Sequence, residues 1–141
     1  MDAPTYVVNV DVAVHDDDTY LLIERAASED HAAGQLAFPG GKLEAPPGTD
    51  GAIAATARRE VREEVGLELG PVEYVCSRTF RADDGTRCLN VVTRAPRAGG
   101  TATAREPDEV AAVHWLTPAE VRSREPPAYL LGYLEQVAAS R

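Results

Sequence analysis

The sequence is poor in basic residues, because only 14 Lys and Arg stand against 23 Asp and Glu. The formal net charge at pH 7 is therefore −9. A protein that follows the phosphate backbone of DNA or RNA needs a basic surface, and so does one that binds an anionic membrane. The composition argues against both partners. A small anionic ligand remains open, provided that a metal ion neutralises its charge locally.

Cysteine and long apolar runs are scarce as well. Cys76 and Cys88 have neither the CxxC spacing of a zinc ribbon nor the density of a disulfide scaffold. The histidines are scattered and form no HExxH motif. No apolar run approaches the roughly 18–20 residues of a membrane span, and the N-terminal residues do not resemble a signal peptide. We therefore expect a cytoplasmic protein whose two cysteines pack in its core.

The length of 141 residues fits one compact domain, which we expect to cover residues 1–141. Alternating apolar residues between turn-forming residues predict five strands. These strands are expected at residues 6–14, 20–23, 72–80, 88–93 and 110–116, with loops at 26–35 and 95–107. Helices and strands do not alternate regularly along the chain. This order predicts an α+β fold or an α/β sandwich with a mixed sheet, rather than a doubly wound fold.

Apolar residues at three- and four-residue spacings predict a helix that begins near Gly51 and ends at Gly66. Asp50 or Thr49 is the expected N-cap. A second, short helix is predicted from Thr117, because Thr117-Pro118-Ala119-Glu120 forms a capping box with Pro at the first helical position. A terminal helix is predicted after Pro126-Pro127, where apolar residues return at helical spacing at Leu130, Leu134 and Val137.

Three carboxylates crowd one side of the first helix. At about 100° per residue, Glu60, Glu63 and Glu64 share an arc of about 100°, beside the apolar face that carries Val61 and Val65. Like charges at these spacings cost about 0.2–0.5 kcal/mol per pair, so they call for a counter-charge. Hard oxygen ligands suit Mg²⁺ or Mn²⁺ better than zinc. The same pattern also describes a solvated helix laced with salt bridges, which remains the alternative.

The segments around this helix make a family resemblance specific. The stretch from Phe38 to Glu44, FPGGKLE, followed by REVREEVGL from Arg59 to Leu67, resembles the Nudix box, Gx5Ex7REUxEExGU, where U is apolar. Its second half matches at every fixed position. Arg25, His31 and Trp115 with the helix after it resemble the MutT-like branch. The resemblance implies a Nudix α/β/α sandwich with a mixed sheet.

The first half of the box departs from the family pattern. The distance from Gly41 to Arg59 is four residues longer than in the family, so Pro47 or Gly51 falls where the pattern has Glu. In the family this Glu supports the loop–helix–loop unit and is not the central metal ligand. Glu44 or Asp50 is the expected substitute. The extra residues are expected to lengthen the loop before the helix.

The resemblance also implies roles for individual residues. Glu60, Glu63 and Glu64 match the carboxylates that hold the divalent metal, together with the carbonyl of Gly40. Glu109 matches a late acidic residue that joins the metal site or acts as the base, and Glu106 and Asp108 are its rivals. The general base is expected among Glu60, Glu64 and Glu109. The remaining roles are phosphate contact by Arg25 and structural support by Arg59, Gly41 and Glu44.

The implied activity is Mg²⁺-dependent or Mn²⁺-dependent hydrolysis of a pyrophosphate bond in a nucleoside di- or triphosphate derivative. Alternatives are a sugar-nucleotide or ADP-ribose pyrophosphatase, and a regulator that binds nucleotides without catalysis. Relatives that clean oxidised guanine nucleotides have Asn after Pro-Pro-Ala, where this chain has Tyr129. Phe80, Tyr129 and Asn90 are candidates for contact with the base. The expected partner is a small nucleotide, and the expected assembly is a monomer or a homodimer.

Overall fold

The computed structural model describes residues 3–27 and 34–141. In this part of the chain, eight strands form one mixed sheet. The strands are β1 (Val7–Asp16), β2 (Thr19–Arg25), β3 (Leu36–Ala37), β4 (Gly40–Lys42), β5 (Glu68–Leu69), β6 (Glu73–Arg81), β7 (Arg87–Gly99) and β8 (Val110–Leu116). The helices are α1 (Ala52–Val65), α2 (Pro118–Ser123) and α3 (Ala128–Ala139). The expected mixed-sheet sandwich is confirmed.

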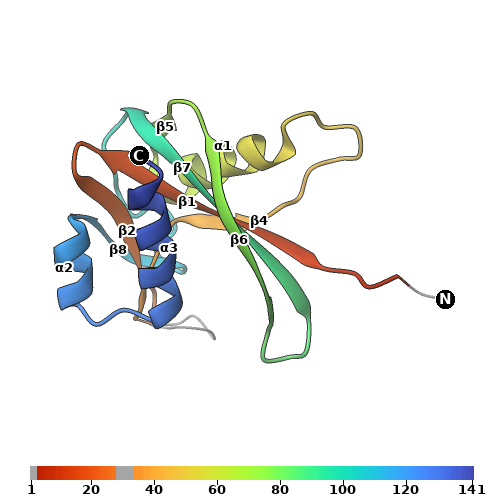
Figure 1. The fold of residues 1–141 in the computed structure, drawn as a ribbon. Coiled ribbons are helices and arrows are strands. Elements are labelled where there is room, and N and C mark those ends of the chain that lie inside the picture. Colours follow the sequence, from red (N-terminus) through yellow and green to blue (C-terminus); the bar gives the residue numbers. More distant parts are fainter. Residues whose placement is uncertain (1–2, 28–33) are drawn as a thin grey trace.

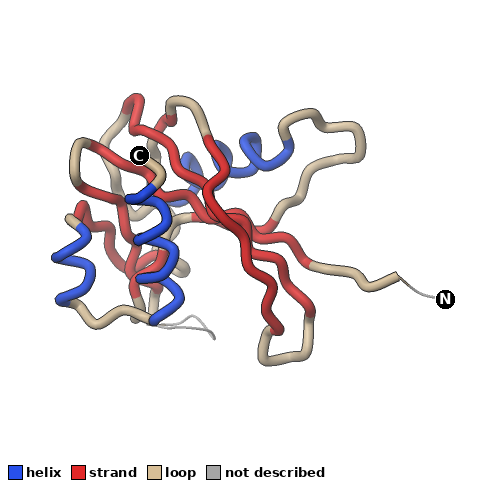
Figure 2. Tube along the Cα trace, in the orientation of Figure 1, coloured by secondary structure: helices blue, strands red, loops and turns tan. Residues whose placement is uncertain are grey.

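The sheet separates two layers of helices, with α1 on one face and α2 and α3 on the other (Figures 1 and 2). Alternation along β1 and β2 supplies both cores. Val10 and Leu21 point to the core under α1, while Ala13 and Leu22 point to the core under α2 and α3. All four side chains have no exposed surface. Period-two alternation in strands buried on both faces therefore builds this three-layer structure.

Strand β1 lies at the centre of the sheet. It pairs in parallel with β7 from Val7 opposite Cys88 to His15 opposite Pro96, and antiparallel with β2 and β4. Strand β4 is short because Pro39 precedes it and cannot donate to the ladder. It places Gly40 opposite Asp11 of β1. This pairing brings the Pro-Gly-Gly turn to the middle of the sheet, beside α1.

The structure corrects the expected boundaries around β7. Residues 95–99 continue this strand, where the sequence predicts a loop from residue 95. Pro96 has no N–H to donate to the sheet, but its carbonyl accepts the N–H of Gly70 at 2.9 Å. The short strands β4 and β5 were not expected, since two or three residues carry no periodic pattern. Residues 28–33 of the expected loop 26–35, with His31, lie outside the described residues.

The first helix begins differently from the expectation. Neither Asp50 nor Thr49 caps α1, because Gly51 holds that position in the left-handed conformation with φ of 60°, and no side chain accepts from the first turn. The Thr49 hydroxyl donates instead to the carbonyl of Pro46 at 2.8 Å. The end of the helix is as expected. Gly66, with φ of 76°, donates its N–H to the carbonyls of Val61 and Arg62.

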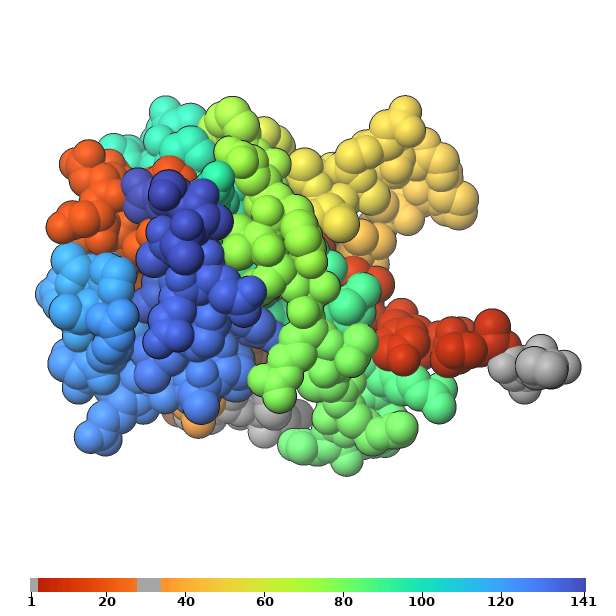
Figure 3. All heavy atoms as spheres, viewed as in Figure 1, coloured from red at the N-terminus to blue at the C-terminus, as the bar shows by residue number. Residues whose placement is uncertain are grey.

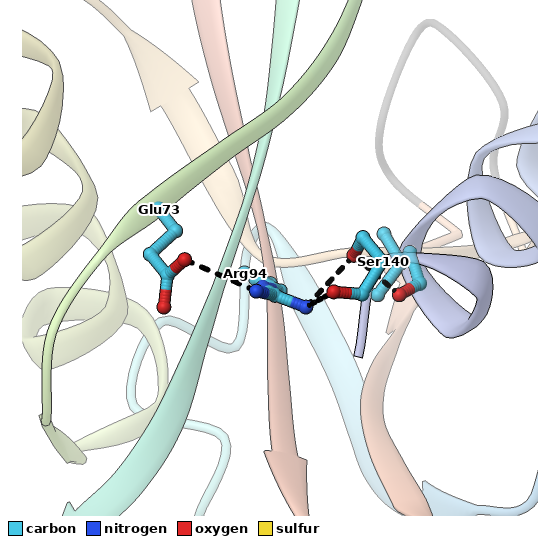
Figure 4. A network of polar contacts seen from close by, with 4 residues as sticks. Glu73, Arg94 and Ser140 are labelled. Atoms are coloured by element: carbon cyan, nitrogen blue, oxygen red, sulfur yellow. Dashed lines mark hydrogen bonds and ion pairs between the residues drawn. The ribbon is translucent and has the colours of Figure 1, made fainter.

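The C-terminal helices agree with the sequence. Strand β8 covers the expected residues, and the capping box of α2 is complete, with Thr117 accepting from the N–H of Glu120. The end of α3 is fastened to the sheet, as Figure 4 shows: Arg94 of β7 binds Glu73 of β6 at 3.0 Å and donates to the carbonyl and hydroxyl oxygens of Ser140. In the described part of the chain, no helix is long and apolar enough to cross a membrane.

Candidate active site

Glu60 and Glu64 extend from α1 toward the two glycines of β4. A Cβ atom on Gly41 would lie 2.5 Å from the carboxyl carbon of Glu60. The N–H of Gly40 donates to the carboxyl group of Glu64. Helical spacing places the two glutamates one turn apart. At Gly41 only glycine leaves room for the Glu60 carboxyl group, whereas a Cβ atom on Gly40 would lie 2.1 Å from the carbonyl oxygen of Val10 in β1. The glycines of the Pro-Gly-Gly turn therefore form a cradle for these carboxyl groups.

Glu64 is unusual because it is a carboxyl group at 5% exposure. Burial raises its pKa from 4.5 to about 9, and the nearby charges of Glu60 and Glu109 act in the same direction. The hydrogen bond from Gly40 opposes this effect only in part. At neutral pH the metal-free protein keeps a proton on Glu64, and a hydrogen bond joins it to Glu60.

Arg59 supplies the nearest positive charge on α1. Its guanidinium binds the Glu60 carboxylate at 3.0 Å and donates to the carbonyl of Lys42 at 3.2 Å. The charges of Glu63 and Glu44 also raise the pKa of Arg59. The arginine thus links α1 to β4 and forms an ion pair with one carboxylate. Glu44 lies close enough for its charge to act on this arginine, and its supporting role stays a prediction.

The segment between β7 and β8 brings two further acids to the site. Glu106 and Glu109 are joined by a hydrogen bond between their side chains, and both backbones belong to one tight turn, because the N–H of Glu109 donates to the carbonyl of Glu106 at 2.8 Å. The hydrogen bond with Glu109 raises the pKa of Glu106, and the charges of Glu63 and Glu60 act in the same direction. The structure therefore places Glu109 and one of its two rivals, Glu106, beside the glutamates of α1.

A second polar cluster lies on the α3 side of the sheet, next to Gly40. Asn90 of β7 donates its amide hydrogens to Asp11 at 2.9 Å and to the hydroxyl of Tyr133 at 3.2 Å. Burial raises the pKa of Asp11 to about 6, and the hydrogen bond from Asn90 and the charge of Arg25 limit the rise. A Cβ atom on Gly40 would lie 3.0 Å from Oδ1 of Asp11. This chain of contacts connects the glutamate cluster to α3.

A groove of about 300 Å³ runs between β6 and α3. Figure 3 shows these two elements side by side on one face of the molecule. The groove is lined by Ser77, Arg78, Ala128, Tyr129, Gly132, Tyr133 and Gln136. The rings of Tyr129 and Tyr133 meet edge to face, with centroids 5.9 Å apart. A planar ring and a polar edge could both be accommodated there.

The structure brings most of the expected site residues together. Glu60, Glu64, Gly40 and Gly41 meet directly, and Arg25 lies close enough for its charge to act on Asp11 and Tyr129. Phe80 is separate from them, because it is 42% exposed on β6 and does not line the groove. Glu63 is exposed. Cys76 and Cys88 are buried, as expected.

Asp11 is the site residue that the sequence did not single out. In the sequence it is one polar residue on an alternating strand, which ordinarily marks the solvent-facing side. Two signals point to it only in the structure: its pairing opposite Gly40, and its hydrogen bond to Asn90 across 79 residues of chain.

The donor set suits a hard divalent cation, although the side chains are not yet arranged around one. Among residues 3–27 and 34–141, no three His, Cys, Asp or Glu side chains form a group that could hold a metal ion as they stand. The glutamates instead lie as two pairs of neighbouring carboxyl groups, Glu60 with Glu64 and Glu106 with Glu109; burial raises the pKa of Glu64, and the hydrogen bond with Glu109 raises the pKa of Glu106. Buried, mutually repelling carboxyl groups are stabilised either by protons or by a cation. A divalent ion that replaces the protons therefore fits this site.

The sequence matches the model of a known protein family over most of its length. The model of the NUDIX domain matches residues 5–133. No curated protein matches the sequence. Among solved structures, the MutT NUDIX hydrolase from Burkholderia pseudomallei is 25% identical, with 94% of this chain and 98% of that chain covered and a TM-score of 0.79.

Two further structures extend the comparison. The E. coli ORF135 protein is 30% identical, with 96% of this chain and 91% of that chain covered and a TM-score of 0.73. The NUDIX domain of Shewanella oneidensis NrtR, solved with ADP ribose, is 20% identical, with 98% and 90% covered and a TM-score of 0.77. At that identity the last similarity concerns the fold alone.

Proposed function

The chain belongs to the NUDIX family of pyrophosphate-bond hydrolases, in its MutT-like branch, and from this premise we propose that it cleaves nucleoside di- or triphosphate derivatives with Mg²⁺ or Mn²⁺. The observation that carries the proposal is the cluster of glutamates against Gly40 and Gly41. Glu60, Glu63 and Glu64 of α1, the carbonyl of Gly40 and Glu109 would hold the metal. When bound, the ion neutralises phosphate oxygens and favours ionisation of a water molecule.

The residues of this chain would orient the substrate and accept a proton. Arg59 keeps the Glu60 carboxylate beside β4 through its ion pair of 3.0 Å. Arg25 would contact a phosphate oxygen, since its positive charge already acts on the Asp11 side of Gly40. The attacking water would give its proton to a carboxylate oxygen of Glu60, Glu64 or Glu109. Each of these groups belongs to the proposed metal-binding set, beside which the phosphate would lie.

The nucleoside would lie toward α3, with Tyr129 in contact with the nucleobase. Support comes from the groove between β6 and α3, and from the continuous contacts from Tyr133 through Asn90 to Asp11 and Gly40. Tyr129 cannot offer the paired donor and acceptor of the Asn that guanine-sanitising relatives have at this point. We therefore propose a substrate range that is not restricted to oxidised guanine nucleotides.

A screen of nucleotides with Mg²⁺ and with Mn²⁺ tests this function. Canonical and oxidised nucleoside triphosphates, sugar nucleotides and ADP-ribose form its arms, and the products are identified by chromatography and mass. Cleavage to phosphate-containing fragments in the triphosphate arm is the expected result. Cleavage only in the other arms would identify a sugar-nucleotide or ADP-ribose pyrophosphatase. Binding without turnover in every arm would contradict the proposal.

Replacement of single carboxylates tests the site. Glu63→Gln and Glu64→Gln should each lower turnover at least about 100-fold, which corresponds to a loss of roughly 3 kcal/mol of transition-state stabilisation. The fold should remain, because each change preserves side-chain shape. Glu135→Gln, at an exposed position on α3, is the matched control and should retain full activity. Near-normal turnover in both site variants would show that the reaction takes place elsewhere.

A further inference from the structure

The C-terminal end of α1 is covered by residues 100–109, which we call the strap. The last carbonyl groups of a helix lack partners within the helix. Two of them are taken by the strap: the N–H of Thr103 donates to the carbonyl of Val65 at 3.0 Å, and the N–H of Arg105 donates to the carbonyl of Glu64 at 2.9 Å. The strap is therefore attached to the helix turn that carries the buried glutamate.

Close packing on glycines accompanies these hydrogen bonds. A Cβ atom on Gly66 would lie 2.5 Å from Nε and 2.7 Å from Cζ of Arg105, so the guanidinium occupies the space that any other residue at this position would need. A Cβ atom on Gly100 would lie 2.7 Å from the carbonyl oxygen of Gly66. The positive charge of Arg105 also stands at the negative end of the dipole of α1, where a cation is favoured.

The far end of the strap presents acids to the site. Glu106 and Glu109 lie beside the α1 glutamates, because Arg105, the chain neighbour of Glu106, donates its N–H to the carbonyl of Glu64 at 2.9 Å. The charge of Glu109 acts on Glu64, and the charges of Glu63 and Glu60 act on Glu106. The carbonyl of Glu109 accepts the N–H of Ala26 at 2.9 Å, which fixes the exit of the strap to β2. Ionised carboxylates on the strap and on α1 repel each other. The attachments at both ends must therefore hold the strap against this repulsion.

We propose that Arg105 is a positioning residue that, by packing on Gly66, holds Glu106 and Glu109 of the strap at the metal-binding glutamates of α1. This inference rests on the proposed function and adds a residue outside the family motif to it. Arg105 does not contact the reacting groups in this role. It acts through the two strap carboxylates, so its effect must disappear when those carboxylates are absent.

Direct titration of the protein with Mn²⁺, followed by electron paramagnetic resonance without substrate, measures this effect. Arg105→Ala should weaken Mn²⁺ binding about tenfold, in the range seen when a residue that orients metal ligands is lost. The urea midpoint of unfolding should fall only slightly, by the loss of one charge at the end of the α1 dipole. Arg122→Ala, at an exposed position on α2, is the control and should bind Mn²⁺ as the wild type does.

A second variant removes the same contact from the helix side. Gly66→Ala should displace the guanidinium and also weaken Mn²⁺ binding about tenfold. It introduces strain at a positive φ, so Gly85→Ala, which has φ of 91° and no neighbour within 4 Å, serves as the matched control for strain alone. The control should lose stability without losing affinity for Mn²⁺.

A double-mutant cycle decides between positioning and a general structural effect. On a Glu106→Gln/Glu109→Gln background, Arg105→Ala should cause no further loss of Mn²⁺ affinity. An Arg105→Ala variant with wild-type affinity, or losses that multiply on that background, would overturn the inference and leave the proposed function intact. A wild-type protein that neither binds Mn²⁺ nor cleaves any nucleotide would overturn both.

Discussion

Glu64 connects the stability of the protein to pH. Its pKa is about 9 in the folded state against 4.5 for an ordinary glutamate. Below pH 4.5 Glu64 is protonated in both the folded and the unfolded state, so it does not affect the free energy of unfolding. As the pH rises from 4.5 to about 9, the unfolded state ionises first and the metal-free protein loses stability. The loss cannot exceed about 1.4 kcal/mol per pH unit.

Glu64→Gln should therefore be more stable than the metal-free wild type at pH 8, because glutamine never ionises. The two proteins should converge as the pH approaches 4.5. Urea unfolding in the presence of a chelator, repeated across this pH range, measures the difference. Asp11 titrates in both proteins, so its contribution cancels in the comparison. A stability difference that does not change with pH would show that Glu64 titrates normally.

The substitution Gly41→Ala tests whether the glycine at this position is needed to make room for the Glu60 carboxyl group. In Gly41→Ala the new Cβ would lie within 2.7 Å of all three atoms of the Glu60 carboxyl group, which must move away. Because a flexible side chain gives way rather than the backbone, the fold should survive, while affinity for Mg²⁺ falls about tenfold or more. Calorimetric titration measures the affinity. Gly99→Ala, whose Cβ would meet only Cβ of Glu68 at 3.9 Å, is the control and should bind normally.

At the scale of elements, helix ends follow local chemistry where a side chain supplies the cap. In α2, Thr117 and Glu120 satisfy each other's backbone N–H groups at 3.2 and 3.0 Å. Thr117→Ala should lower the free energy of unfolding by about 1 kcal/mol, the ordinary cost of losing such a cap. Urea unfolding should show a lower midpoint with an unchanged slope. An unchanged midpoint would mean that packing of Val121 alone holds α2.

The beginning of α1 shows where such local reasoning fails. The chain between β4 and α1 projects from the rest of the molecule (Figure 1), and its residues from 45 to 51 are mostly exposed. Gly51 turns the chain into the helix with a left-handed backbone, which leaves the neighbouring cap-forming side chains unused. This loop lies between Glu44 and the helix, where the sequence predicts one. The choice of cap depends on how this loop approaches the helix, which no local pattern encodes.

At the scale of the whole molecule, metal binding should stabilise the folded state by mass action. A ligand present at 100 times its dissociation constant adds about 2.7 kcal/mol. Calorimetry with Mg²⁺ and with a chelator should therefore show a higher melting temperature in Mg²⁺. The difference should grow from pH 6 to pH 8, because Mg²⁺ must displace the proton held by Glu64. An equal rise in Glu64→Gln would place the stabilising ion at another site.

The sequence by itself determined the features that depend on residues close together in the chain. Strand alternation, the capping box at Thr117, the stop at Gly66 and the arc of Glu60, Glu63 and Glu64 each depend on residues within about one helical turn or one strand. Their physical causes are local, so residue order alone specifies them.

Only the tertiary structure decided which distant groups meet. The pairing of β4 with β1 sets Gly40 opposite Asp11 and against Glu64, and Asn90 reaches Asp11 from 79 residues away. The raised pKa of Glu64 follows from burial that its position on an amphipathic helix did not reveal. Likewise, the contact of Arg105 with Gly66 arises because the strap returns across the end of α1. Such contacts depend on how the layers pack, and packing is a property of the whole chain.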